Sequence, residues 1–323
     1  MSKFIRNLCL GIALALNITA PASAQDAYPS KPIRILVGYP PGSATATAAR
    51  NYSIKLTERL GQSVIIENRP GASGTLAAEA VARAAPDGYT LLAGTPSELA
   101  LNRPAGMQLR YDPEKDLIPI ALLFTTTPVL IASVASGHKT LREFVEAAKA
   151  KPGILSIASV NVYQQVLLST FEKASGIKLN VVYYKGTALA LTDVLGGQID
   201  ALVGYPAEMS PHVQSGRVRG LALIGPQRNP FMPDTPIIAE AGYPMPDLMT
   251  WGGFFAPAGT SAAIVEKLNR ETIASGESPE LKAAIAKTGS DLRPLTSKAF
   301  KEFIDAEIAK WDRLVKDSGV KIQ

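Results

Sequence analysis

Short apolar runs alternate with helix-like segments along almost the whole chain. Runs rich in β-branched residues are typical of buried strands, and apolar residues spaced three or four apart are typical of helices. The pattern predicts strands at residues 33–37, 64–67, 89–93, 118–123, 129–133, 154–158, 181–183, 201–203 and 221–224. It predicts helices that start near Ala46 and cover 75–84, 141–150, 163–175, 187–195, 263–275, 279–288 and 297–318. Repeated strand–helix units with short links favour parallel sheets flanked by helices.

The strand–helix pattern occurs in two blocks. Residues 128–228 repeat the pattern of the first 125 residues, and the chain then returns near Trp251–Ala256 with another apolar segment. A chain of this length is long for one core and suits two. We expect two α/β domains, one formed by 27–127 with 229–323 and the other by 128–228. Ligands bind where loops at the carboxyl ends of strands converge, which here predicts a cleft between the domains.

Residues 1–24 have the pattern of an export signal. Lys3 and Arg6 give a positive start, residues 8–16 form an apolar stretch too short to span a bilayer, and Ala22-Ser23-Ala24 is a cleavage site. No later segment reaches the roughly 18 apolar residues that a membrane span needs. We expect a chain that is exported to the periplasm and cleaved after Ala24.

Composition argues against several classes of function. Cys9, the only cysteine, lies in the leader, so the mature chain offers no disulfide, thiol nucleophile or thiolate metal site. Without the two basic leader residues the net charge falls from +5 to +3, and no basic block interleaved with aromatics predicts nucleic-acid binding. Two separate histidines do not match a zinc site, and neither G-x-S-x-G nor G-x-G-x-x-G occurs. We expect a binding protein rather than an enzyme.

The stretch 33–50 reads as a strand, a loop of small residues and a helix start. The loop, Gly38–Ala44, is rich in proline, glycine and serine, and Thr45 is placed to cap the helix. The first N–H groups of a helix have no partner within it, so they offer donors and a positive dipole end to an anion. The stretch predicts an anion site, although an ordinary strand–helix turn explains the same residues.

Two other strand ends carry polar residues of the same kind. Thr95, Pro96 and Ser97 follow the third strand, and Asn161 and Gln164 start a helix in the second block. Each group either contacts a ligand or only caps the helix that follows it.

Seven segments together resemble the solute receptors of tripartite tricarboxylate transporters, often called Bug-type receptors. In order they are Tyr28-Pro29-Ser30-Lys31-Pro32-Ile33-Arg34, Pro41-Gly42, Glu67-Asn68-Arg69-Pro70-Gly71, Pro86-Asp87-Gly88-Tyr89-Thr90-Leu91, Tyr184-Lys185-Gly186, Leu195-Gly196-Gly197-Gln198-Ile199-Asp200 and Phe255-Ala256-Pro257-Ala258-Gly259-Thr260. Each is a common turn or helix end, but seven in this order are specific, and they cover essentially the whole mature chain.

The resemblance implies a type II-like periplasmic binding protein, with two α/β domains that close on a small carboxylate held by backbone amides. It implies delivery to a membrane permease made of two other subunits, and it implies no cofactor and no metal. We expect the receptor to be a monomer.

Three segments depart from the family's pattern near the ligand. Ala46 stands where family members often have Asp, although Pro41–Thr45 keeps the backbone donors. Gly204-Tyr205 replaces an Asp-Asn pair of many relatives, and Ser159–Tyr163 is bulkier than the family's glycine-rich loop. A ligand ammonium would need those carboxylates, so we expect a di- or tricarboxylate or an aromatic acid rather than an amino acid.

Three tyrosines are expected to form flat apolar walls of the site, whereas Trp251 is expected in the hinge or the core. The expected ligand-binding residues are Tyr39, Gly42, Ser43, Ala44, Thr45, Thr95, Pro96, Ser97, Ser159, Asn161, Tyr163, Gln164 and Tyr205. Two alternatives stay open: a ligand-loaded partner of a two-component sensor kinase, and an exported hydrolase.

Overall fold

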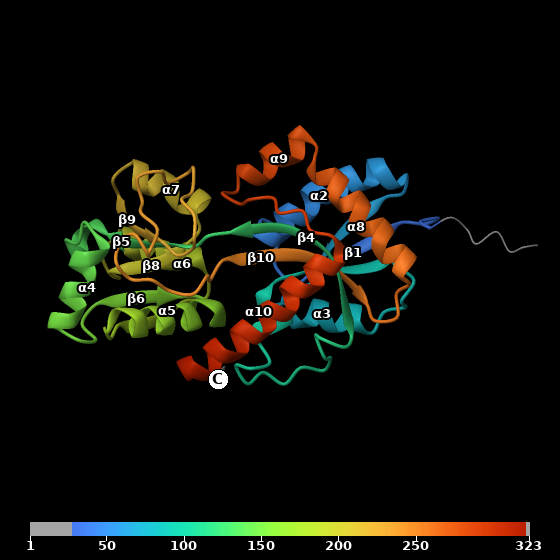
Figure 1. Cartoon of the computed structure of the whole chain (residues 1–323). Helices are drawn as coiled ribbons and strands as arrows, with labels where there is room; N and C mark the ends of the chain where they lie inside the picture. The colour runs from blue at the N-terminus through green and yellow to red at the C-terminus, as the bar shows by residue number, and fades with distance from the viewer. Residues whose placement is uncertain (1–27, 321–323) are drawn as a thin grey trace, which may run out of the picture.

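The structure, a computed structural model, describes residues 28–320, so the predicted leader lies outside the described residues. Two lobes lie side by side in Figure 1, each built on a five-stranded sheet. The first sheet has the order β2-β1-β3-β10-β4, with β1 (Ile33–Val37), β2 (Val64–Asn68), β3 (Thr90–Gly94), β4 (Leu117–Thr126) and β10 (Thr250–Pro257). The second has the order β7-β6-β8-β5-β9, with β5 (Val129–Ser133), β6 (Ser156–Ser159), β7 (Asn180–Tyr183), β8 (Ala201–Gly204) and β9 (Val218–Leu223).

Both sheets are mixed, so the prediction of parallel sheets is wrong in part. β1 runs parallel to β2 and β3, and β6 runs parallel to β7 and β8. β10 runs antiparallel between β3 and β4, and β5 runs antiparallel between β8 and β9. These are the strands by which the chain enters one lobe from the other. Neither follows a crossover helix within its own sheet, which is the connection that parallel neighbours need.

The helices cover the sheets at nearly the predicted positions. They are α2 (Ala44–Leu60), α3 (Thr75–Ala82), α4 (Leu141–Ala150), α5 (Val162–Ser175), α6 (Thr187–Leu195), α7 (Pro206–Gln214), α8 (Ala262–Gly276), α9 (Pro279–Ala286) and α10 (Ser297–Ser318), with the short helical turns η1 (Ala72–Gly74), η2 (Ser97–Leu101) and η3 (Val134–Ser136). The sequence reasoning missed α7 and η2. Pro206 stands at the first position of α7, where proline is tolerated, but Pro211 inside this helix disguises its pattern.

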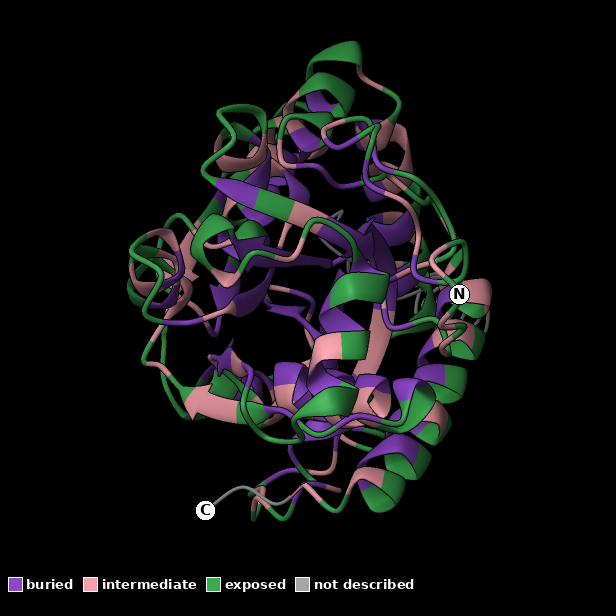
Figure 2. Ribbon diagram, turned by 90° about the vertical axis from the view of Figure 1, so that its left-hand side faces the viewer, coloured by how far each residue is buried: buried purple, intermediate pink, exposed green. Residues whose placement is uncertain are grey.

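Buried residues concentrate on the strands and on one face of the helices (Figure 2). One hydrophobic cluster joins the lobes, since it includes Leu92 of the first sheet, Phe171 of α5 and Trp311 of α10. The Trp311 ring lies 5.4 Å from the ring of Tyr163 in α5. The C-terminal helix α10 therefore packs against both lobes (Figure 1). Within residues 28–320, no helix has the length and apolarity to cross a membrane.

The segment after β9 stays with the second lobe. Leu223 N–H donates to Pro236 O and Ile238 N–H donates to Leu223 O, both at 2.8 Å. Met232 belongs to the hydrophobic cluster of the second sheet, and Phe231 packs against it. We therefore propose that the second lobe extends from residue 128 to about residue 238, beyond the expected end at 228, and that the first lobe comprises the rest of the folded chain.

Candidate functional site

A cavity of about 960 Å³ lies between the two lobes. Its lining residues come from loops of both, which makes it the counterpart of the expected cleft. They are Tyr39, Pro40, Gly42, Ser43, Ala44, Thr45, Thr47, Thr95, Pro96, Ser97, Phe124, Asn161, Tyr163, Gly186, Thr187, Ala188, Tyr205, Ala207, Glu208, Thr250, Trp251, Lys287 and Thr288. This volume is in the range of small-molecule sites.

The loop between β1 and α2 is held tightly in place. Gly38 is required where the loop leaves β1, because a Cβ there would lie 2.4 Å from Gly74 Cα. The Tyr39 carbonyl accepts a hydrogen bond from the Asn68 side chain at 2.8 Å. Gly42 adopts φ +89°, a conformation that suits glycine. The loop therefore presents its backbone to the cavity from a fixed position.

Ser43, not Thr45, caps α2. Its backbone is extended, and its hydroxyl accepts a hydrogen bond from Ala46 N–H at 3.3 Å, as an N-cap residue does. Thr45 lies inside the first turn, so the expectation that it caps the helix is wrong. The N–H groups of Ala44 and Thr45 have no acceptor among the described residues. Both residues line the cavity, and these N–H groups are free to bind an anion.

Thr95 is tied to the first loop through a buried acid. The hydroxyl groups of Tyr39 and Thr95 lie 2.8 Å apart, and both donate to Glu98 Oε2, at 2.8 and 2.7 Å. Thr95 N–H donates to Glu98 Oε1 at 3.0 Å. Burial raises the pKa of Glu98 to about 7 and that of Tyr39 well above its usual value. The sequence reasoning missed Glu98, which lies one residue beyond the expected Thr95–Ser97 group.

In the second lobe, two of the expected residues support the cavity wall without lining it. Gln164 accepts a hydrogen bond from Val160 N–H and donates one to Val203 O, both at 2.9 Å. Ser159 is fully buried at the end of β6. Asn161 does line the cavity, and its side chain caps α5 by accepting from Gln164 N–H at 2.9 Å. Asn161 therefore caps its helix at the wall, and Gln164 fastens that helix to β8.

Four helices direct their N-termini at the cavity. The lining residues Ala44, Asn161, Thr187 and Ala207 each lie at or next to the start of a different helix, namely α2, α5, α6 and α7. The first turns of α2, α5 and α6 contain no acidic residue. Each helix start contributes partial positive charge, worth about 0.3–1 kcal/mol to an anion at an exposed site. The cavity is therefore built to hold negative charge.

The sequence profile of the tripartite tricarboxylate transporter family receptors matches residues 48–320. The chain belongs to this receptor family. BugT of Bordetella pertussis is 32% identical over 100% of this chain and 99% of its own length. Two solved structures from Rhodopseudomonas palustris are also similar. Rpa4515 with adipate is 28% identical, covers 91% of this chain and 99% of its own, and has a TM-score of 0.82. MatC with bound malate is 30% identical, covers 89% and 100%, and has a TM-score of 0.77.

The family confirms the expected fold class, a periplasmic binding protein with two α/β lobes. Members of the family are periplasmic solute receptors rather than enzymes. Eleven of the expected site residues line the receptor's cavity, and the two others, Ser159 and Gln164, lie behind it.

Several lining residues of the receptor had no signal in the sequence. Lys287 follows α9 and Glu208 lies in the first turn of α7, so the cavity has one basic and one acidic side chain. Burial raises the pKa of Glu208. Trp251 is buried, as expected, but it also lines the cavity. Among residues 28–320, no group of three or more His, Cys, Asp or Glu residues is placed to bind a metal.

Proposed function

We propose that the receptor captures a small carboxylate, a di- or tricarboxylate or an aromatic acid, and delivers it to the membrane subunits of a tripartite transporter. The convergence of four helix N-termini on one cavity carries this proposal, because their partial positive charge and the free N–H groups of Ala44 and Thr45 suit carboxylate oxygens. The adipate and malate bound to the two relatives are acids of this class. The absence of acidic residues from three of the four first turns argues against a cationic ligand.

The aromatic walls are consistent with either class of acid. Tyr163 and Tyr205 come from the second lobe, and Phe124 and Trp251 come from the first. A ligand between them contacts both lobes and favours the closed arrangement, which the permease would recognise. Periplasmic location follows from the expected leader and from the family, and the sensor-kinase alternative and the monomeric state remain predictions.

A panel of ligands tests the proposal. The mature chain, from Gln25 on, is heated with adipate, malate, citrate, benzoate, glutamate or glucose while its unfolding is followed. One acid at about 100 times its Kd should add about 2.7 kcal/mol to the stability of the receptor and raise its Tm. Stabilisation by glucose with none by any acid, or by the amino acid glutamate alone, would contradict the proposal.

A further inference from the structure

Three oxygen atoms form a closed triangle behind the cavity wall. Tyr39 Oη, Thr95 Oγ1 and Glu98 Oε2 are separated from one another by 2.8, 2.8 and 2.7 Å. Oxygen atoms at such distances share a proton, so the three contacts call for three protons. The two hydroxyl groups supply two. The third is present only when Glu98 is protonated, since an ionised carboxylate leaves two oxygen atoms in contact without a proton between them.

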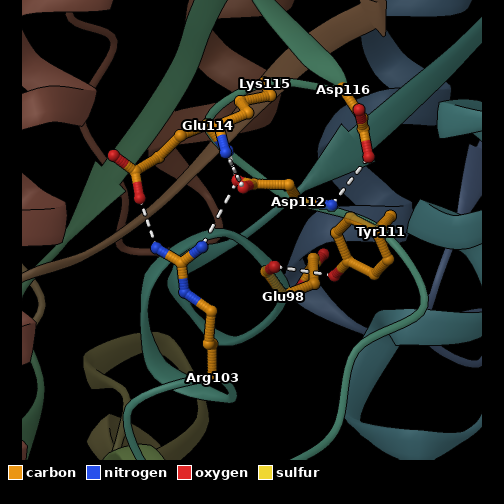
Figure 3. A network of polar contacts seen from close by, with 7 residues as sticks. All are labelled: Glu98, Arg103, Tyr111, Asp112, Glu114, Lys115 and Asp116. Carbon is orange, nitrogen blue, oxygen red and sulfur yellow. Dashed lines mark hydrogen bonds and ion pairs between the residues drawn. The ribbon is translucent and has the colours of Figure 1, made fainter.

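The surroundings of Glu98 favour its protonated form. The residue is 1% exposed, and no Lys, Arg or His of the described chain forms an ion pair with it. Tyr111 is another titratable residue in contact with Glu98, but its hydroxyl donates to the Glu98 backbone carbonyl, at 2.7 Å, and not to the carboxyl. Figure 3 shows that Arg103 instead pairs with Asp112 and Glu114. Burial without a nearby cation disfavours the ionised carboxylate, so it favours the protonated form of Glu98.

The charged residues on the neighbouring helices are also engaged elsewhere. On α10, Glu307 pairs with Lys310, and on α3, Glu79 pairs with Arg83. On α5, the Tyr163 hydroxyl donates to Leu248 O. Protonation of Glu98 therefore depends on its own burial and on the Tyr39–Thr95 hydroxyl pair.

We propose that Glu98 is a positioning residue whose proton decides which way the Tyr39 and Thr95 hydroxyl groups point, so that the receptor binds carboxylates more tightly when Glu98 is protonated. This rests on the proposed function. Ionised Glu98 holds both hydroxyl protons, so neither hydroxyl group has a proton to donate to a ligand oxygen. Protonated Glu98 donates to one hydroxyl group, and the proton of that hydroxyl, which lies between the two hydroxyl oxygens when no ligand is bound, can turn to a ligand oxygen. Carboxylate binding then takes up a proton as pH rises above 7.

The first test needs no ligand. Infrared difference spectra between the wild type and Glu98→Gln should show a protonated carboxyl band at pH 6 that is lost at pH 8.5. Ultraviolet resonance Raman difference spectra between the wild type and Tyr39→Phe should show Tyr39 change its hydrogen bonding over the same range. The proposal would be overturned if the carboxyl band were absent at pH 6, or if the Raman signal of Tyr39 did not change between pH 6 and pH 8.5.

The second test measures binding of adipate and malate by calorimetry at pH 6 and pH 8.5, in buffers of different ionisation enthalpy. The wild type should lose affinity by on the order of tenfold at the higher pH and should take up protons on binding at pH 8.5 but not at pH 6. Glu98→Gln, which carries amide protons at every pH, should bind equally at both. Glu208→Gln, which changes the acidic side chain that lines the cavity itself, should keep the pH dependence of the wild type.

The outcomes separate the two proposals. A pH dependence that disappears in Glu208→Gln and persists in Glu98→Gln would overturn the role of Glu98 while leaving a carboxylate receptor. If both spectroscopic tests give the expected result but no acid of the panel binds at either pH, the proposed function is wrong, and the effect of the Glu98 proton on the two hydroxyl groups still stands.

Discussion

Glu98 combines a buried position with the absence of a counter-charge. It sits under the loop that presents Thr95, and a Cβ on Gly74 would lie 2.8 Å from Glu98 Oε2, so little room is left for water beside it. Its carboxyl accepts hydrogen bonds from two hydroxyl groups and one N–H. These bonds offset the cost of burial only in part, which is why burial raises the pKa of Glu98 from 4.5 to about 7.

This pKa has a consequence for stability. A carboxyl whose pKa is higher in the folded than in the unfolded state binds more protons when folded, so it stabilises the fold at low pH and loses that effect as pH rises from about 4.5 to about 7. The wild type should lose roughly 2–3 kcal/mol over this range relative to Glu98→Gln. Urea unfolding of both proteins at pH 4.5 and 8 measures the difference, and parallel pH profiles would contradict it.

The roles of single residues could be predicted from the sequence to different degrees. The donors of Gly42–Thr45 were predictable, because a proline- and glycine-rich loop between a strand and a helix is a local pattern. Glu98 and Lys287 were not, because burial and approach to the cavity depend on segments distant in the chain. Trp251 was predicted to be buried, but its share in the cavity wall depends on where β10 lies between the lobes.

At the scale of elements, the role of the α2 N-terminus in binding can be tested directly by mutation. Ala44 is its first residue, with a free N–H, and the preceding Ser43 has φ −62° and ψ 154°. This conformation is the one favoured before a proline, and the first helical position tolerates proline. Ala44→Pro therefore removes one backbone donor from the cavity with little cost to the helix.

Ala44→Pro should weaken binding of the cognate acid by roughly tenfold or more, since a hydrogen bond to a charged group contributes about 1.5–3 kcal/mol. Ala262→Pro is the matched control. It makes the same change at the first position of α8, after Ser261 with φ −61° and ψ 146°, and Ala262 does not line the cavity. Calorimetry on both variants decides the point, and equal affinities would mean that the α2 N-terminus does not hold the carboxylate.

Helix α10 is fastened to β10 by one carboxylate. Glu307 Oε2 accepts from the indole N–H groups of Trp251 and Trp311, at 2.9 and 3.0 Å. Glu307 is 7% exposed, and its other oxygen accepts from Lys310 at 2.5 Å. The two tryptophans are the only ones in the chain. This carboxylate therefore connects the wall of the cavity to the helix that packs against both lobes.

Glu307→Ala should lower the free energy of unfolding by about 3 kcal/mol, because it leaves two buried N–H groups without an acceptor. Asp305→Ala, on the exposed face of the same helix, removes only a surface pair with Lys301 and should cost less than about 1 kcal/mol. Denaturant unfolding of the two variants gives the comparison. Similar losses in both would show that the indole contacts contribute nothing specific.

Helices with a clear hydrophobic periodicity were predicted well, whereas the direction of strands, which depends on how they pair, was predicted poorly. α4, α6 and α10 have the predicted bounds, because their apolar residues and the residues that flank them are local signals. The direction of β5 and β10 was wrong, since strand direction depends on how the chain passes between lobes. Periodicity over a short apolar run does not contain that information.

On the scale of the whole molecule, the lobes approach each other beside the cavity. Ala207 is the second residue of α7 in the second lobe, and Gly289 follows α9 in the first. A Cβ built on Gly289 would lie 3.4 Å from Ala207 Cβ, close to the separation of two disulfide-linked cysteines. Gly289 has φ +69°, so a side chain there brings some strain.

A disulfide between Ala207→Cys and Gly289→Cys should lock the lobes together. Release of a bound acid should slow by on the order of tenfold or more in the oxidised protein, because exchange requires the lobes to separate. Reduction should restore the wild-type rate, and each single variant serves as a control. Stopped-flow displacement measures the rates, and unchanged release from the oxidised protein would show that exchange needs no separation at this edge.

The place of β10 also determines the order in which the receptor acquires its structure. All strands of the second sheet lie between residues 129 and 223, so that lobe has its strands before β10 has been made. The first sheet does not close until Thr250–Pro257 is inserted between β3 and β4, which have no other contact within the sheet across that gap. A nascent chain with about its last quarter missing therefore keeps an open sheet in its first lobe. The first lobe therefore completes its sheet only after the second lobe already has all of its strands.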